Sequence, residues 1–256
     1  MRVVKAINHG NKILSLRRPN ENQNWFWGPL KESGLHDLVY LGYAIVPHAL
    51  LMTLCERWHP ETNTFHMPSG EMTVTLDDVA CLTHLQIEGR MVSHGKKMLR
   101  HEAATLLVMH LGVSQTEAEK ISGTEYGGFI SYPKLRELYT RYLDRANKLA
   151  GTEEMEELER VRKFFVRFYL LYLVGCLLFG ERSNKRIELV YLMTMEDGYA
   201  GMRNYSWGGM TLAYLYNELA VIPILNVSRK FSMCIIFSTG YIRVYNIKTS
   251  NEYYLQ

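Results

Sequence analysis

The longest apolar stretch of the chain runs from Phe164 to Phe179 and is interrupted only by Arg167. It follows a run of glutamates that begins at Glu153, and acidic side chains stabilise the positive end of a helix. The pattern therefore predicts one long helix over residues 153–179. A helix that crosses a bilayer needs about 20 apolar residues, and this stretch has 16. We interpret it as a helix buried in the core and expect no membrane association.

Helical periodicity recurs in shorter segments on both sides of this helix. Apolar positions three and four residues apart predict helices in 35–58, 76–82, 101–111, 133–142, 187–195 and 207–219. Two capping signals support these assignments, because Thr75 and Ser114 each precede an acidic residue by three positions. The sequence therefore predicts a mainly α fold, a compact multi-helix domain.

The period changes to that of strands in two places. Residues 62–75 surround the turn-forming Pro68-Ser69-Gly70 and predict a small β-hairpin. In the tail, 233–237 and 241–247 flank a Ser-Thr-Gly turn and indicate a C-terminal hairpin. The first 33 residues are polar and rich in Asn. We therefore divide the chain into a basic irregular arm (1–33), a helical domain (34–220) and an atypical tail (221–256).

Charge is distributed unevenly along the 256 residues, although the net charge is only +3. Residues 1–20 carry five cations and no acid, residues 21–220 carry 20 cations and 25 acids, and the tail is again basic. The 47% hydrophobic content excludes a disordered chain. A domain that binds nucleic acid with its whole face is usually basic throughout. The acidic body argues against that function, while the basic ends keep a nucleic-acid-binding protein as an alternative.

Catalytic signatures are absent from the sequence. The four cysteines form no CxxC pair, and no phosphate-binding glycine loop or nucleophile elbow is present. Adjacent histidines and acids around the hairpin leave a second alternative, a metal-dependent hydrolase. Its ligands would be His59, Glu61, His66 and Glu71, but their spacing matches no known zinc signature. We therefore expect no catalytic residues, no cofactor and no metal.

Four ordered motifs resemble the plant mobile domain family, which is also labelled aminotransferase-like. The first is the segment 56–79, with its Trp-His-Pro-Glu-Thr, Thr-Phe-His, Gly-Glu-Met-Thr and Leu-Asp-Asp-Val text. It is followed by Leu-Gln-Ile-Glu-Gly-Arg at 85–90 and by the hydrophobic 168–173. Tyr-Ser-Trp-Gly at 205–208, followed by 212–216, resembles the closing motif. Asn63 departs from the family, where His is common, and the change in composition near 221 leads us to hypothesise an altered C-terminus.

The resemblance implies a helical domain shared by transposon-encoded and domesticated proteins of the MAINTENANCE OF MERISTEMS type. Such proteins are nuclear and act in transposon and gene silencing, gene expression and meristem maintenance. The resemblance also implies a protein partner, a phosphatase-7-like serine/threonine phosphatase, and no established catalytic set. An aminotransferase would need a Schiff-base lysine and a phosphate-binding cup that cannot be placed here.

Several hairpin and motif residues are the candidates for interaction. Large aromatic side chains dominate buried area, so we expect Trp58, Phe65 and Trp207 to be core anchors. Pro60, Pro68 and Gly70 are expected to set turn geometry. The hairpin tip is polar, which favours its acids and histidine as contact residues. The full set is Trp58, Pro60, Glu61, Phe65, His66, Pro68, Gly70, Glu71, Asp78, Tyr205 and Trp207.

Overall fold

The central apolar run forms one continuous helical column. In the computed structural model, α8 spans Met155–Leu173 and continues directly into a π-helical turn, η2, over Val174–Leu178. All side chains from Phe165 to Phe179 are buried, which confirms the predicted core helix. The structure describes residues 5–7, 10–41, 48–92, 98–122, 128–180, 185–221 and 230–232.

Helices dominate the described part of the chain, so the predicted mainly α fold is confirmed. Those that precede α8 are α1 (Gly10–Leu14), α2 (Asn24–Ser33), η1 (His36–Val39), α3 (His48–Glu56), α4 (Leu76–Thr83), α5 (Arg100–Leu111), α6 (Gln115–Ile121) and α7 (Tyr132–Leu149). Those that follow η2 are η3 (Leu189–Met195), α9 (Gly198–Gly201), η4 (Met202–Asn204) and α10 (Trp207–Val221). Among the described helices, none is both long and apolar enough to span a membrane.

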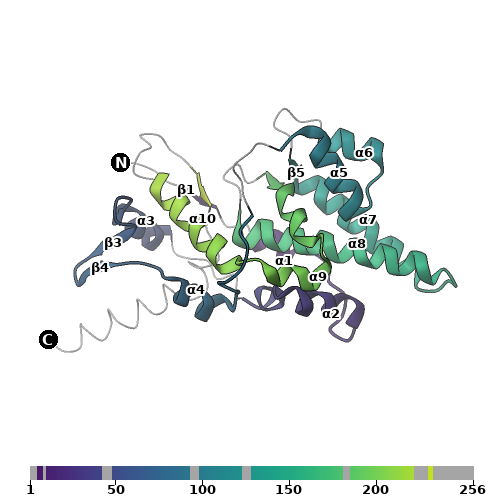
Figure 1. Ribbon diagram of the computed structural model, residues 1–256, viewed down its shortest axis with the longest axis horizontal. Helices are drawn as coiled ribbons and strands as arrows, with labels where there is room; N and C mark the ends of the chain where they lie inside the picture. Colours follow the sequence, from purple (N-terminus) through teal and green to yellow (C-terminus); the bar gives the residue numbers. More distant parts are fainter. Residues whose placement is uncertain are drawn as a thin grey trace.

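Helices α7 and α8 lie side by side, and the end at which they join projects from the rest of the molecule (Figure 1). Pro133 occupies the first turn of α7, as the sequence predicts. The ring of Tyr139 on α7 lies 4.6 Å from that of Phe165 on α8, between centroids. Tyr142 packs in the same way on Phe168 at 5.0 Å. Aromatic contacts of this kind hold the two helices together.

Residues 1–33, expected to be irregular, contain two helices, α1 and α2. Residues 24–33 form α2, in which Phe26 and Leu30 are completely buried. The Phe26 ring lies 5.1 Å from Tyr169 of α8. Three consecutive aromatic residues and an internal Pro29 obscure helical periodicity in the sequence. The helix forms because α8 offers these rings an apolar surface on which to pack.

Arg167 lies inside the apolar column, where both of its terminal nitrogens are hydrogen-bonded and its buried Nε has no partner among the described residues. Its guanidinium donates hydrogen bonds of 3.3 to 3.5 Å to the carbonyl oxygens of Met109, His110 and Met195. Burial, together with the charge of Arg167, lowers the pKa of His110 to about 4, so the imidazole is neutral at pH 7. Arg167 therefore joins the end of α5 and η3 to α8 and is not available to a ligand.

Within the part of the chain that the structure describes, the strands form three small sheets. The predicted hairpin is present as β3 (Thr64–Met67) and β4 (Gly70–Met72), which pair antiparallel, and β2 (Trp58–His59) adds a third strand beside β3. Trp58 therefore begins a strand instead of ending the predicted helix. Two further pairs are β5 (Phe129–Ser131) with β6 (Arg186–Glu188), antiparallel, and β1 (Lys5–Ile7) with β7 (Lys230–Ser232), parallel. The predicted C-terminal hairpin lies outside the described residues.

The segment predicted as a helix over 187–195 begins as a strand. Ile187 pairs with Ile130 of β5, and the 3-10 helix η3 starts only at Leu189. Close packing explains the choice, because the Ile187 side chain lies against Gly175 of η2. A Cβ atom at Gly175 would come within 2.5 Å of it. The tertiary contact outweighs the local helical pattern.

Candidate functional site: a motif clasp and an aromatic groove

The aromatic residues of the hairpin motif lie inside the protein. Trp58 and Phe65 are 3% and 0% exposed, and their rings pack edge to face at 4.8 Å. The other side of Trp58 faces the ring of Tyr216 on α10, at 5.3 Å. The prediction that these aromatic residues are core anchors is confirmed. They attach the hairpin to α10 and leave only its polar edge to solvent.

Tyr216 also fixes the strand that leads out of the hairpin. Its hydroxyl donates to the carbonyl oxygen of Val74 at 2.5 Å and lies 2.9 Å from the hydroxyl of Thr73. The Thr73 hydroxyl donates in turn to the carbonyl oxygen of Asn63 at 2.6 Å. One tyrosine of the closing motif therefore holds both ends of the hairpin motif, which is more than 140 residues away in the sequence.

The second and closing motifs bind each other through their backbones. The amide of Arg90 donates to the carbonyl oxygen of Asn204 at 2.7 Å, and the amide of Ser206 donates to the carbonyl oxygen of Arg90 at 2.8 Å. The Ser206 hydroxyl donates to the carbonyl oxygen of Ile87 at 2.6 Å. The Gly208 amide donates to the carbonyl oxygen of Gln86 at 2.8 Å. We call this contact between residues 85–90 and 204–208 the clasp.

The geometry of the clasp accounts for the residue found at three of its positions. Gly89 has φ +118°, and a Cβ atom there would lie 2.5 Å from the carbonyl oxygen of Asn204, so only glycine fits. Trp207 is 1% exposed, and its indole donates to Met202 at 2.8 Å, which confirms its predicted role as an anchor. Tyr205 is half-buried, with the guanidinium of Arg90 4.8 Å from the centre of its ring.

The predicted polar candidates of the hairpin are at the surface but form no metal site. Glu61, His66 and Glu71 are exposed, and the rings of His59 and His66 lie 5.7 Å apart. Glu71 accepts a hydrogen bond from Thr64 at 3.2 Å. Within the described residues, no three His, Cys, Asp or Glu side chains come close enough together to hold a metal ion. The alternative of a metal-dependent hydrolase has no site in this part of the chain.

The remaining candidates shape the backbone. Asp78 completes a capping box: its carboxylate accepts from the amide of Thr75 at 2.8 Å, while the Thr75 hydroxyl accepts from the amide of Asp78 at 3.2 Å. Pro68 lies in the turn between β3 and β4, and Gly70 begins β4 with φ +120°. Pro60 is half-buried in the turn after β2. These residues set the geometry of the hairpin.

A hollow of about 690 Å³ opens beside the clasp, and we call it the aromatic groove. Its longest wall is α10, with Tyr214, Tyr216 and Ala213. The opposite wall comes from η2 and η3, where Phe179 and Tyr191 stack at 4.7 Å. The complete lining is Asn63, Met91, Val92, Phe179, Glu188, Tyr191, Met210, Ala213, Tyr214, Tyr216, Asn217 and Ala220.

The chemistry of the groove suits binding. Burial raises the pKa of Tyr191 far above its ordinary value, and the hydroxyl of Tyr214 is engaged by the carbonyl oxygen of Gly180. Tyr191 is therefore not poised to ionise. Glu188 is the acidic residue of the lining. Sequence reasoning selected none of the lining residues as a site, because they come from separate segments of the chain. The motif at 212–216 was a signal for three of them, Ala213, Tyr214 and Tyr216.

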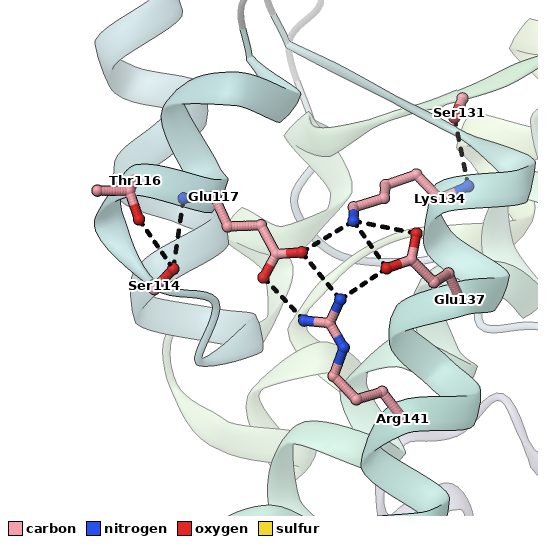
Figure 2. A network of polar contacts seen from close by, with 7 residues as sticks. All are labelled: Ser114, Thr116, Glu117, Ser131, Lys134, Glu137 and Arg141. Atoms are coloured by element: carbon pink, nitrogen blue, oxygen red, sulfur yellow. Dashed lines mark hydrogen bonds and ion pairs between the residues drawn. The ribbon is translucent and has the colours of Figure 1, made fainter.

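A second polar feature lies between α6 and α7. The carboxylate of Glu117 is 2.8 Å from both Lys134 and Arg141, and Glu137 pairs with the same two cations at 2.9 and 2.6 Å (Figure 2). We call these four side chains the ion-pair ridge. The hydrogen bonds from Arg141 and Lys134 hold the pKa of Glu117 at about 2. The ridge therefore stays fully ionised at neutral pH.

The fold and the site together define a mainly helical domain. Its ordered motifs form the clasp and hold a β-hairpin beside the aromatic groove. The chain belongs to the plant mobile domain family, whose sequence profile matches residues 34–238. The match extends past residue 220, the boundary expected from the sequence.

Relatives in Arabidopsis thaliana carry the same domain within longer chains. The protein named serine/threonine-protein phosphatase 7 long form homolog is 33% identical over 214 residues, which is 82% of this chain and 14% of that protein. Protein MAIN-LIKE 2 is 34% identical over 66% of this chain and 22% of its own length. Protein MAINTENANCE OF MERISTEMS is 31% identical over 70% of this chain and 34% of its own length. No solved structure matches the chain significantly.

Proposed function

We propose that this chain is a non-enzymatic interaction module of nuclear transposon and gene silencing, whose aromatic groove receives a segment of a partner protein. The observation that carries the proposal is the composition of the groove. Tyrosine, phenylalanine and methionine side chains surround a single carboxylate, Glu188. Concave apolar surfaces with few polar groups are typical binding sites, and aromatic residues are enriched in protein interfaces.

The absence of catalytic chemistry in the groove supports a non-enzymatic role. Its described lining contains no Cys, His, Ser or Lys, and Glu188 is its single carboxylate, so the lining holds no nucleophile with an adjacent second group to activate it. The acids and histidines of the hairpin are dispersed on an exposed edge. The motif residues that sequence reasoning selected hold the backbone, as in the clasp, instead of pointing toward a common reacting atom.

The occupant that we propose is an apolar segment supplied by a phosphatase-7-like serine/threonine phosphatase. The tyrosines of the groove would cover this segment. Similarity to a protein named for such a phosphatase supports this partner. Similarity to Protein MAINTENANCE OF MERISTEMS supports a role in meristem maintenance and gene expression.

Isothermal titration of the full chain with a purified phosphatase-7-like protein tests the proposal. Ala213 is exposed in the groove lining, so Ala213→Arg fills the groove without opening a cavity. We expect it to weaken binding by about tenfold or more, which is the loss typical of blocking an interface centre. The matched control is Ala150→Arg, the same change at an exposed alanine after α7.

The outcomes separate the alternatives. Equal affinity of both variants and the unchanged chain would exclude the groove as the binding surface, and absence of binding by the unchanged chain would exclude this partner. Nuclear function is tested in plant cells that lack a relative of this chain. We expect the tagged chain to enter the nucleus and lower transposon transcripts there, and Ala213→Arg to lose the second effect alone.

A further inference from the structure

The aromatic groove has an apolar floor and a partly polar rim. Phe179, Tyr191 and Met210 are buried and form the floor. Two asparagines lie on the rim, Asn63 in the turn before β3 and Asn217 on α10, and both are exposed. A segment held by apolar contacts alone would not need these two amides. Their position therefore indicates which kind of segment the groove accepts.

The side-chain amides of both asparagines are open to a ligand. Among the residues that the structure describes, neither amide has a hydrogen-bond partner, and only the main-chain carbonyl oxygen of Asn63 is engaged, by the hydroxyl of Thr73. A carboxamide offers an N–H donor and a C=O acceptor, the same pair that a peptide unit offers. A partner that covers the rim removes water from these amides. Each amide then needs a new hydrogen bond, because an unpaired polar group that becomes buried weakens binding.

We propose that the occupant of the aromatic groove lies in an extended conformation and that Asn63 and Asn217 hydrogen-bond to its main chain. The inference rests on the proposed function, which places a segment of a partner protein in this groove. An extended segment presents main-chain N–H and C=O groups to its surroundings along its whole length. A helix uses these groups in its own hydrogen bonds. The extended conformation therefore supplies partners to both amides, and the interior of a helix supplies none.

The dimensions of the groove favour the same conformation. Its wall on α10 includes Met210, Ala213, Asn217 and Ala220, which lie three or four positions apart on one face of the helix. From Met210 to Ala220 this wall is about 15 Å long. An extended segment of that length has about five residues and, at about 4.8 by 10 Å in cross-section, occupies about 700 Å³. A helix of the same length is about 10 Å wide and occupies about 1,200 Å³. The hollow of about 690 Å³ therefore matches the extended segment.

Isothermal titration of the full chain with the purified phosphatase-7-like protein distinguishes the two conformations. Asn217→Leu removes one amide from the rim at an exposed helical position, where leucine is a good helix former. We expect it to weaken the binding of an extended occupant about tenfold, because a main-chain group of the occupant loses its partner. A helical occupant would bind equally or more tightly, since leucine adds apolar contact. The matched control, Asn147→Leu at an exposed position of α7 outside the groove, should change the affinity by less than about twofold.

Asn63→Gly tests the other amide. The residue has φ +53°, a conformation that glycine adopts readily, and the hydrogen bond from Thr73 is kept because it goes to the main chain. We expect a loss of affinity similar to that of Asn217→Leu. Linear seven-residue peptides that together cover the phosphatase-7-like protein provide a second measurement. One of them should bind the groove, and N-methylation of its central main-chain amides should weaken its binding at least about tenfold.

The results separate this inference from the proposed function. If Ala213→Arg weakens binding while Asn217→Leu and Asn63→Gly do not, the groove still binds the partner, but the extended conformation is wrong. Binding of the whole partner without binding of any linear peptide would likewise overturn the inference, because the groove would then accept a folded surface. An equal loss in Asn147→Leu would show that the rim amides have no special role. No binding of the whole partner by the unchanged chain would overturn both the proposed function and the inference.

Discussion

Two regions of the molecule begin with the same sequence pattern and use it differently. Thr75 and Ser114 each start a helix, and each is followed by an acidic residue three positions later. At the start of α4, the carboxylate of Asp78 returns to the amide of Thr75 and closes a capping box. At the start of α6, Ser114 accepts from the amide of Glu117 at 3.3 Å. The Glu117 carboxylate turns instead to Lys134 and Arg141.

In both regions the neighbouring sequence determines the hydrogen bond that caps the helix. Residues far away in the chain determine which groups the acidic side chain contacts. Asp78 lies near the clasp, where steric fit and backbone hydrogen bonds hold the motifs together. Glu117 lies on the ridge, where charge joins two helices. We therefore expect the clasp region to respond to changes in volume and shape, and the ridge to respond to pH and salt.

The largest effect should follow removal of the buried indole in the clasp. Trp207→Ala deletes a side chain that is 1% exposed and removes the hydrogen bond from the indole to the carbonyl oxygen of Met202. We expect the free energy of unfolding to fall by about 4 kcal/mol. Urea unfolding followed by circular dichroism measures the change. Trp25→Ala, at a half-buried indole on α2, is the matched control and should cost clearly less; equal losses would contradict the role of burial in the clasp.

A steric test of the clasp comes next in size. Gly89 and Gly70 have nearly the same φ, +118° and +120°, but an added Cβ meets the Asn204 carbonyl oxygen at 2.5 Å only at Gly89. Gly70→Ala carries the conformational cost alone, about 1 kcal/mol. Gly89→Ala adds a clash with backbone, and we expect about 3 kcal/mol in total. Thermal unfolding measures the loss of stability in each variant. The difference between the two losses is the cost of the clash at Gly89. If the two losses are equal, the 85–90 segment does not bind 204–208 as closely as described.

The features that could be predicted from sequence are those with local causes. The cap at Thr75 and the start of α7 close to residue 133 each depend on a few neighbouring residues, and both are confirmed. Charge and periodicity likewise identified α8. The hairpin was predicted because Pro68 and Gly70 are turn formers with strand residues on both sides.

The features that could not be predicted depend on partners far away in the chain. Helix α2 forms against α8, and Arg203 supports its end by donating to the carbonyl oxygens of Lys31 and Glu32 at 2.7 and 2.8 Å. Glu188 reaches the aromatic groove because β6 pairs with β5.

The ridge should differ from the clasp in its dependence on pH. The pKa of Glu117 is lowered from 4.5 to about 2 in the folded protein. The stability that this carboxylate contributes is therefore complete above pH 4.5 and is lost as the pH falls toward about 2. We expect Glu117→Gln to lower the free energy of unfolding at pH 7 by about 1 kcal/mol, the upper range for partly exposed ion pairs. Urea unfolding at pH 7, 5 and 3 measures the effect.

The control for this test is Glu61→Gln, at an exposed acid of the hairpin turn, which should leave stability unchanged. The gap between the Glu117→Gln variant and the unchanged chain should narrow between pH 5 and 3, and also in high salt, because the pairs are partly exposed. A gap that persists at pH 3 would mean that the carboxylate acts through packing and not through its charge.

The smallest effect compares the two caps directly. The Thr75 hydroxyl accepts from the amide of Asp78 and donates to its carboxylate at 2.8 Å. The Ser114 hydroxyl accepts from the amide of Glu117 and is shared with Thr116 at 3.4 Å. We therefore expect Thr75→Ala to cost about 1 kcal/mol and Ser114→Ala about 0.5 kcal/mol.

The two substitutions should also be additive within about 0.5 kcal/mol, since the caps share no partner. Thermal unfolding of the single and double variants provides the test. Coupling beyond that limit would connect the clasp region to the ridge, and a larger loss at Ser114 would show that the one-sided cap is the stronger. Either result would reverse the conclusion that the reciprocal bond from the acid is what strengthens the cap on α4.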